Sequence, residues 1–314
     1  MKVLFIDSVH PILKDQLQAV GFQCDEFPEK SHKELKAILG TYDGVVIRSK
    51  FKFTPEVFDI ATNLKFIARS GAGMENIDLS YAKQKNVICF NSPEGNRDAV
   101  GEHALGMLLC LFNHLHMANL EVRQGLWQRE KNRGLEIKGK TVAIIGCGNM
   151  GMAFAQRLQG FECNVIGYDK YKSGFGNNWI KEVSLEEVFE TADIVSLHTP
   201  LQDDTFHLVN AKWIESFQKP FYLINTARGK NVSTKALTEG IESGKILGAC
   251  LDVLEFESTS FENVDWKIVP QEMQYLIESD KVLLSPHVAG WTVESYIKLS
   301  SFLAEKIINQ FHES

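Results

Sequence analysis

Three polar residues that could take part in chemistry follow three apolar segments of the sequence. Arg228 follows FYLINTA, Glu257 lies a few residues after ILGACLDV, and His287 follows KVLLSP. Histidine exchanges protons near neutral pH, a neighbouring carboxylate favours its charged form, and arginine binds a carboxylate through two parallel hydrogen bonds. Each residue alone is more often a surface or structural residue. If the three segments are parallel strands of one sheet, their carboxyl ends share an edge, where the side chains could hold a small acid and move its proton.

Apolar segments of strand length alternate with amphipathic segments along the chain, which indicates an α/β fold with mostly parallel sheets. The 314 residues are enough for two domains. A long helix is predicted from Asp98 to about Leu120, and a helical pattern from about Thr292 to Phe311 could complete either domain. Strands are predicted on both sides of the long helix, at 3–6, 44–48, 66–68 and 87–90 before it, and at 141–146, 163–169, 193–198, 221–226, 246–253 and 281–285 after it.

A glycine-rich loop follows the first predicted strand of the second series. It reads Gly146-Cys147-Gly148-Asn149-Met150-Gly151 and opens a helical pattern. Such glycines permit a tight turn, close approach of a pyrophosphate and close packing of helix on strand, and the helix N-terminus attracts phosphate. Asp169 ends the next strand, where a carboxylate can bind ribose hydroxyls and repel a 2′-phosphate.

The sequence therefore predicts an NAD site rather than an NADP site. The residues that we expect to line it are Gly146, Gly148, Asn149, Met150, Gly151, Asp169, Thr199, Thr226, Ala227, Arg228 and Asp252.

Composition and charge exclude several other functions. The formal net charge of -7 argues against nucleic acid as a partner, and no segment has the ~20 uninterrupted apolar residues that cross a membrane. The first residues, MKVLFID, lack the pattern of a secretory signal, so we expect a cytoplasmic protein. The six cysteines have no C-x-x-C spacing, so neither a metal site nor a disulfide framework is predicted.

On these motifs the chain resembles the D-isomer-specific 2-hydroxyacid dehydrogenases over essentially its whole length. Asn225-Thr-Ala-Arg-Gly229 resembles the arginine signature of that family, Asp252-Val253 with Glu257 its D-V-x-x-x-E signature, and Ser285-Pro-His-Val-Ala-Gly290 its histidine signature. The resemblance implies hydride transfer to or from C2 of a hydroxy acid, with Arg228, Glu257 and His287 as catalytic residues. After Glu257 the family often has proline where this chain has Ser258, and the stretch 258–280 has no place in the pattern.

The same resemblance implies a domain arrangement that patterning alone does not show. Two Rossmann-like, doubly wound domains are expected, with the dinucleotide domain, 99–287, inserted into a substrate domain made of 1–98 and 288–314. A homodimer is implied as well, with the helix after Asp98 in the interface. In the first domain, Ser70-Gly-Ala-Gly-Met-Glu-Asn-Ile-Asp78 resembles the loop that holds the substrate carboxylate, although Glu75 replaces the usual aspartate.

Within the family, the pattern is most similar to that of phosphoglycerate dehydrogenases. Arg48-Ser49 and Arg69-Ser70-Gly71 resemble segments whose arginines can reach a phosphate. This favours 3-phosphoglycerate and 3-phosphohydroxypyruvate, a step of serine biosynthesis, over the hydroxypyruvate or glyoxylate of a reductase. A binding protein of the NAD-sensing corepressor type is the alternative from another class. The expected substrate-binding residues are Arg48, Ser49, Arg69, Ser70, Gly71, Ala72 and Gly73.

Overall fold

The computed structural model describes residues 1–257, 266 and 269–312. The described chain divides into two compact units, the first made of 1–97 and 291–312 and the second of 98–257 and 269–290. The predicted boundaries at 98 and 287 lie close to these points. The assignment of substrate and cofactor to the two units remains a prediction.

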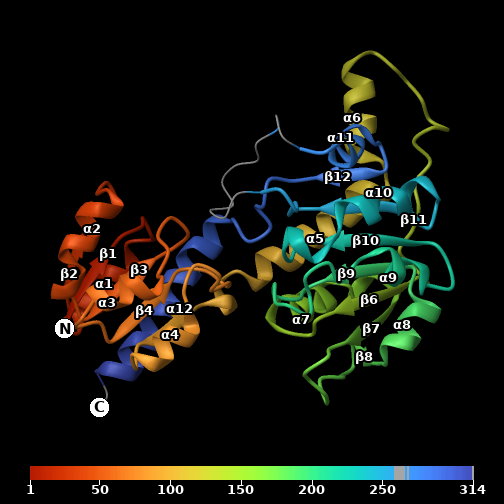
Figure 1. Cartoon of the computed structure of the whole chain (residues 1–314). Helices are drawn as coiled ribbons and strands as arrows, with labels where there is room; N and C mark the ends of the chain where they lie inside the picture. The colour runs from red at the N-terminus through yellow and green to blue at the C-terminus, as the bar shows by residue number, and fades with distance from the viewer. Residues whose placement is uncertain (258–265, 267–268, 313–314) are drawn as a thin grey trace. The chain divides into compact units, whose positions relative to one another are not determined.

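The first unit is built around a parallel sheet with the strand order β2-β1-β3-β4-β5. Its middle strands are buried on both faces, because helices cover the sheet on each side (Figure 1). The strands are β1 (Lys2–Phe5), β2 (Gln23–Glu26), β3 (Gly44–Ile47), β4 (Phe66–Arg69) and β5 (Ile88–Asn91). The helices are α1 (Ile12–Ala19), α2 (His32–Ile38), η1 (Leu39–Thr41), α3 (Pro55–Ile60), α4 (Leu79–Gln84), η2 (Pro93–Gly95) and α12 (Val293–Phe311).

The helix α12 returns to the first unit from the far end of the sequence. Its side chains Leu303, Ala304 and Ile307 are fully buried and pack in one cluster with Phe5 and Phe66 of the sheet. Thr292 caps the helix, because its hydroxyl accepts a hydrogen bond from the backbone N–H of Ser295 at 3.0 Å. The predicted helix from Thr292 to Phe311 therefore exists and completes the first unit.

The second unit contains a larger parallel sheet, in the order β12-β11-β10-β9-β6-β7-β8. Two buried clusters cover its two faces, one with Val195, Leu223 and Ile241, the other with Ile144 and Phe154. The strands are β6 (Thr141–Ile145), β7 (Asn164–Tyr168), β8 (Lys181–Glu182), β9 (Ile194–Leu197), β10 (Phe221–Asn225), β11 (Ile246–Leu251) and β12 (Val282–Leu284). The helices are α5 (Arg97–Phe112), α6 (Leu115–Arg123), α7 (Asn149–Arg157), η3 (Gln159–Phe161), α8 (Leu185–Thr191), α9 (Ala211–Glu215), η4 (Gly229–Asn231), α10 (Thr234–Glu242) and α11 (Gln271–Glu278).

Both units are α/β with parallel sheets, so the predicted fold class is confirmed. The single long helix predicted from Asp98 to Leu120 is wrong, because the structure has α5 and α6 with a break between them. His114 adopts a left-handed conformation, φ 49°, and the carbonyl of Phe112 accepts a hydrogen bond from the backbone N–H of Leu135 at 2.9 Å. The returning segment thus takes the carbonyl that a continuous helix would have used.

Two edge strands, β2 and β8, were not predicted. The unplaced stretch 258–280 includes α11, and its residues 258–265 and 267–268 lie outside the described part of the chain. Among the described residues, no helix combines the length and the apolar character that crossing a membrane requires.

Candidate active site

The carboxyl edge of the second unit's sheet collects most of the predicted site residues. The strand order reverses at β6, since β7 and β8 continue on one side of it and β9, β10, β11 and β12 on the other. Ligands of doubly wound folds bind beyond the carboxyl ends of the strands at such a point. The glycine loop follows β6, Asp169 follows β7, and Thr199 lies just after β9.

The first and last positions of the loop each require glycine, for different structural reasons. Gly146 has φ 92°, in the left-handed region, and its backbone N–H donates to the carbonyl of Tyr168 at 2.9 Å. A Cβ on Gly151 would lie only 2.1 Å from the carbonyl oxygen of Gly146. The helix α7 can therefore lie against β6 only with glycine at 151, as the sequence predicted.

The middle of the loop leaves room for a ligand at the start of α7. Gly148 is the N-cap residue, and no side chain caps the helix, whose first residues are Asn149 and Met150. The atom nearest to a Cβ on Gly148 would be Nζ of Lys172, 3.9 Å away, so the protein does not fill this space. Backbone N–H groups at a helix N-terminus favour a phosphate there.

Asp169 lies beside the glycine loop and is held by backbone groups. Its Oδ2 accepts a hydrogen bond from the backbone N–H of Cys147 at 2.8 Å, and its Oδ1 accepts from those of Tyr171 and Lys172 at 2.9 and 3.0 Å. A carboxylate at the end of β7 is thus fixed next to the loop. This geometry fits the binding of ribose hydroxyls.

The hydroxyls of two threonines are further evidence for a ligand site at the same edge of the sheet. Within the part of the chain that the structure describes, the Oγ1 atoms of Thr199 and Thr226 are buried and have no hydrogen-bond partner. A buried polar atom without a partner costs about 1–3 kcal/mol, so a ligand that reaches these hydroxyls would gain from them. Together with Gly148 they fit the predicted dinucleotide site.

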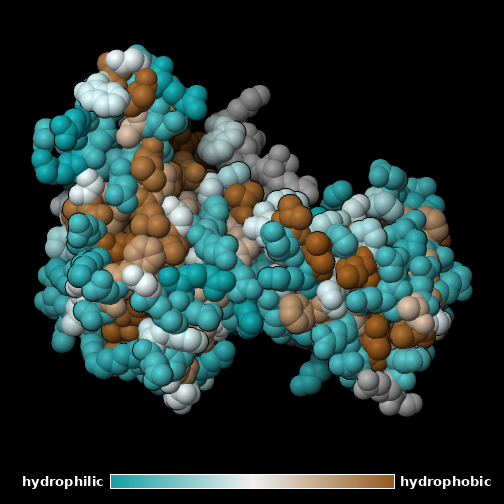
Figure 2. Space-filling model, turned by 180° about the vertical axis from the view of Figure 1, so that it is seen from behind, coloured by the Kyte–Doolittle hydropathy of each residue, from teal (hydrophilic) through white to brown (hydrophobic). Residues whose placement is uncertain are grey.

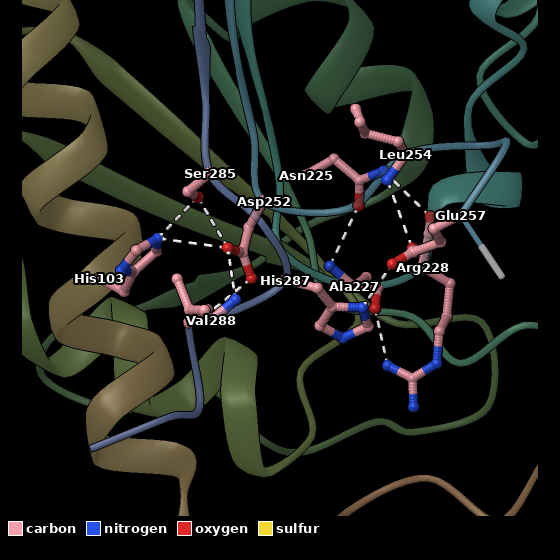
Figure 3. A network of polar contacts seen from close by, with 11 residues as sticks. His103, Asn225, Ala227, Arg228, Asp252, Leu254, Glu257, Ser285, His287 and Val288 are labelled. Carbon is pink, nitrogen blue, oxygen red and sulfur yellow. Dashed lines mark hydrogen bonds and ion pairs between the residues drawn. The ribbon is translucent and has the colours of Figure 1, made fainter. Parts of the chain in front are cut away.

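His287 and Glu257 form a direct pair (Figure 3). Nδ1 of His287 lies 2.7 Å from Oε2 of Glu257, and both side chains are largely buried. Glu257 is itself anchored, since its Oε1 accepts from the backbone N–H of Leu254 at 3.3 Å. The structure therefore brings together two of the three predicted catalytic residues from separate segments of the chain.

Asp252 holds the backbone of the loop that carries His287. Its carboxylate accepts hydrogen bonds from the hydroxyl of Ser285 at 2.7 Å and from the backbone N–H groups of Val288 and Ala289, each at 2.9 Å. Burial raises the pKa of this carboxyl, but hydrogen bonds from His103, Ser285 and the two backbone groups outweigh it, so the pKa lies below its ordinary value. Asp252, expected only to line the cofactor site, thus also shapes the histidine loop.

His103 belongs to the same network, although no sequence pattern assigns it a role. Its Nε2 lies 3.0 Å from Oγ of Ser285 and 3.5 Å from Oδ1 of Asp252. Figure 3 draws both contacts as dashed lines. His103 is on α5, far from both partners in sequence. Only the tertiary contact identifies it.

Arg228 is carried by a turn that packs against the loop of Glu257. The side chain of Asn225 spans this turn, accepting from the backbone N–H of Ala227 at 3.1 Å and donating to the carbonyl of Arg228 at 3.0 Å. A Cβ on Gly229 would lie 1.9 Å from the carbonyl oxygen of Leu254. The backbones of the two catalytic segments are therefore in contact.

The predicted substrate residues lie on the first unit, at the carboxyl ends of β3 and β4. Arg48 is held by three side chains: Asp7 accepts from its backbone N–H at 2.5 Å, while Nε of Arg69 and Nδ2 of Asn76 donate to its carbonyl at 3.2 and 3.1 Å. Its guanidinium lies over the ring of Trp291, 4.4 Å from the centroid. Trp291, which directly follows the histidine signature, was missed by sequence reasoning.

The glycine segment after Arg69 is also held by backbone contacts. Ser70 donates its backbone N–H to the carbonyl of Ile47 at 2.8 Å, Gly71 accepts from Ser92 at 3.0 Å, and Ala72 accepts from the side chain of Asn91 at 2.6 Å. Ser49 and Gly73 are partly exposed neighbours of this edge. The seven predicted substrate residues therefore belong to two adjacent strand ends of one sheet.

Known proteins are similar to this chain in sequence and fold. The family model described as D-isomer specific 2-hydroxyacid dehydrogenase, NAD binding domain, matches residues 105–289. D-3-phosphoglycerate dehydrogenase of Archaeoglobus fulgidus is 32% identical over 311 residues, covering 98% of this chain and 57% of that protein. Hydroxypyruvate reductase of Thermotoga maritima is 34% identical over 277 residues, covering 88% of this chain and 87% of that protein.

A solved structure is similar over the whole chain. TP0037 from Treponema pallidum, a D-lactate dehydrogenase, is 28% identical with a TM-score of 0.83, covering 100% of this chain and 97% of that one. The chain spans about half the length of the phosphoglycerate dehydrogenases that it matches.

Proposed function

The chain belongs to the D-isomer specific 2-hydroxyacid dehydrogenase family, and from this premise we propose that it interconverts a D-2-hydroxy acid and its 2-keto acid with NAD. The family resemblance inferred from the motifs is thereby confirmed, as is NAD as the cofactor of the matched domain. The substrate pair that we propose is 3-phosphoglycerate and 3-phosphohydroxypyruvate.

The observation that carries the proposal is the 2.7 Å contact between His287 and Glu257 beside the turn of Arg228. Because Glu257 engages Nδ1, Nε2 is the ring nitrogen that exchanges a proton with the C2 oxygen of the substrate. Arg228 binds the substrate carboxylate and polarises that oxygen. The glycine loop and Asp169 would hold NAD, which would supply the hydride acceptor for oxidation at C2 and, as NADH, the hydride donor for reduction.

The preference for NAD over NADP rests on Asp169. Its carboxylate is fixed beside the glycine loop by three backbone N–H groups, so it cannot easily turn away from a bound ribose. A 2′-phosphate would meet a negative charge there.

The preference for a phosphorylated substrate rests on Arg48 and Arg69. Two arginines at adjacent strand ends concentrate positive charge on a chain whose formal net charge is -7, and Trp291 holds one guanidinium in place. An arginine can bind a phosphate through two parallel hydrogen bonds. Hydroxypyruvate is the second candidate substrate, because the Thermotoga maritima hydroxypyruvate reductase matches most of the chain.

A panel of keto acids tests the substrate. NADH oxidation is followed with 3-phosphohydroxypyruvate, hydroxypyruvate, glyoxylate and pyruvate. We expect the highest kcat/KM with the phosphorylated acid, and equal kcat/KM for phosphorylated and free hydroxypyruvate would contradict the proposal. Arg48→Gln should raise KM for the phosphorylated acid by about tenfold or more, since a hydrogen bond to a charged group contributes about 1.5–3 kcal/mol.

Two further variants test whether the rise in KM is specific to the Arg48 guanidinium. Trp291→Ala leaves the charge of Arg48 but removes the stacking, so we expect a smaller rise in the same KM, about two- to fivefold. Lys33→Gln removes an exposed charge on α2 of the same unit and should leave every KM unchanged.

We also propose a homodimer that acts in the cytoplasm. The segment 115–135 exposes large apolar side chains, and Figure 2 shows brown apolar surface on the unit that carries α6. All six cysteines are free, in keeping with a reducing compartment. Light scattering should give twice the chain mass for the wild type and a lower mass for Leu120→Glu. A monomeric wild type would contradict the dimer.

A further inference from the structure

The second unit contains another histidine–carboxylate pair, to which the proposed chemistry assigns no part. Nε2 of His207 lies 2.7 Å from Oε1 of Glu255, and both side chains are partly buried. Glu255 is two residues before Glu257 in the same loop. The pair therefore lies next to the catalytic loop without belonging to the catalytic pair.

Glu255 connects two elements at once. While Oε1 contacts His207, Oε2 accepts a hydrogen bond from the backbone N–H of Thr234, the first residue of α10, at 2.8 Å. Burial raises the pKa of Glu255, but the hydrogen bonds from Thr234 and His207 outweigh it, so its pKa lies below the ordinary value. The side chain is thus an ionised acceptor between two fixed donors.

His207 is attached to the turn that follows Arg228. Its backbone N–H donates to the carbonyl of Lys230 at 2.8 Å, and its φ of 47° is left-handed. Its ring stacks on that of Phe206, with 4.1 Å between the centroids. A displacement of His207 therefore acts directly on the Arg228–Lys230 turn.

The position of Glu255 is also linked to that of Glu257. Leu254, its neighbour, donates its backbone N–H to Oε1 of Glu257 and accepts from the backbone N–H of Glu257, both at 3.3 Å. The carbonyl of Leu254 also packs on Gly229. His207 and Glu255 thus connect the two backbone segments that carry the catalytic side chains.

We propose that His207 and Glu255 are positioning residues, which brace the turn of Arg228 against the loop of Glu257. The inference rests on the proposed dehydrogenase function. When the brace is lost, the two segments separate, and a misplacement of about 1 Å in a catalytic site can cost about 100-fold in rate. A pair that only stabilised α10 would change the melting temperature and leave kcat intact.

The variants are chosen to separate these two roles. Glu255→Ala removes both contacts, whereas Glu255→Gln keeps an oxygen for Thr234 and an amide for His207. His207→Asn tolerates the left-handed backbone but is too short to reach Glu255. Glu187→Ala is the matched control, because it removes an ion pair with Lys181 of 2.6 Å elsewhere on the same unit.

For Glu255→Ala and His207→Asn we expect kcat to fall about tenfold or more, with a smaller change in the Kd of NAD, because the glycine loop and Asp169 follow other strands. Glu255→Gln should recover most of the kcat, and Glu187→Ala should match the wild type. Unchanged kcat in folded Glu255→Ala and His207→Asn would overturn the brace, and so would failure of Glu255→Gln to recover activity.

Hydrogen exchange tests the same brace without turnover. In Glu255→Ala and His207→Asn, backbone exchange should increase both in 226–232 and in 252–257. Unchanged exchange in 252–257, or an increase confined to the start of α10, would overturn the brace. Absence of turnover in the wild type over the keto-acid panel would instead reject the proposed function, while the exchange result would still decide the brace.

Discussion

Gly229→Ala tests whether contact between the two catalytic segments sets the position of Arg228. The added Cβ would lie 1.9 Å from the carbonyl oxygen of Leu254, and real contacts of this kind are essentially never closer than 3.0 Å. The backbones must therefore separate by about 1.1 Å, the difference between these distances. The φ of Gly229 lies outside the left-handed region, so the substitution changes only the space.

The size of the effect follows from that separation. Overpacking a well-packed site costs about 1–3 kcal/mol of stability, and a shift of about 1 Å in a catalytic constellation can cost about 100-fold in rate. We expect kcat of Gly229→Ala to fall about 100-fold with a moderate loss in Tm. The glycine loop and Asp169 follow other strands, so the Kd of NAD should change less than kcat.

Steady-state kinetics, thermal melting and a fluorescence titration with NADH measure these three quantities. Gly160→Ala is the control, because nothing lies within 4 Å of its added Cβ on the same unit. It should keep wild-type kcat and Tm. A folded Gly229→Ala protein with wild-type kcat would refute the idea that this contact positions Arg228.

Three other outcomes follow from the site. His287→Ala should lower kcat by about 100-fold to 10,000-fold with little change in the Kd of NAD, and near-wild-type turnover would reject it as the acid-base group. Asp169→Ala should raise kcat/KM with NADP relative to NAD, and an unchanged ratio would show that the carboxylate does not select the cofactor. His198 directly follows β9, where its Nε2 lies 2.8 Å from Oγ of Ser196, and burial lowers its pKa to about 3 from 6.5. The unfolded chain therefore binds a proton below about pH 6.5 that the folded chain does not, so the free energy of unfolding falls as pH falls toward 3, by about 1.4 kcal/mol per pH unit from this residue. Urea melts between about pH 7 and pH 5 should show a shallower decline for His198→Asn than for the wild type, and equal slopes would contradict the assignment.

Most of the sheets could be predicted because their strands are buried on both faces. Such strands read as continuous apolar segments, as Gly44–Ile47 and Ile194–Leu197 do. The strands that escaped prediction, Gln23–Glu26 and Lys181–Glu182, are short and polar and lie at sheet edges. Their strand conformation depends on backbone pairing with a neighbour, which leaves little trace in composition.

The break between α5 and α6 at His114 was not predicted, for a related reason. The apolar pattern continues through it, whereas the left-handed residue is stabilised by a segment about 20 residues later, through the bond from Leu135 to Phe112. Helical periodicity reports which side is buried. It does not report where a distant segment competes for a backbone carbonyl.

The sequence by itself determined the positions of those site residues that directly follow a predicted strand. Parallel strands share a carboxyl edge, so the glycine loop, Asp169, Arg228 and His287 could be placed on one edge of the second sheet from local pattern alone. The glycines at 146 and 151 could be predicted too, because a left-handed turn and a helix lying on a strand exclude a side chain at those positions.

Only the tertiary structure decided which side chains touch. The network of His103 with Asp252, the stacking of Trp291 on Arg48 and the brace of His207 and Glu255 each join residues from separate segments. Hydrogen bonds and ring contacts act over a few ångströms, and those distances are set by the packing of the whole unit rather than by the residues near them in sequence.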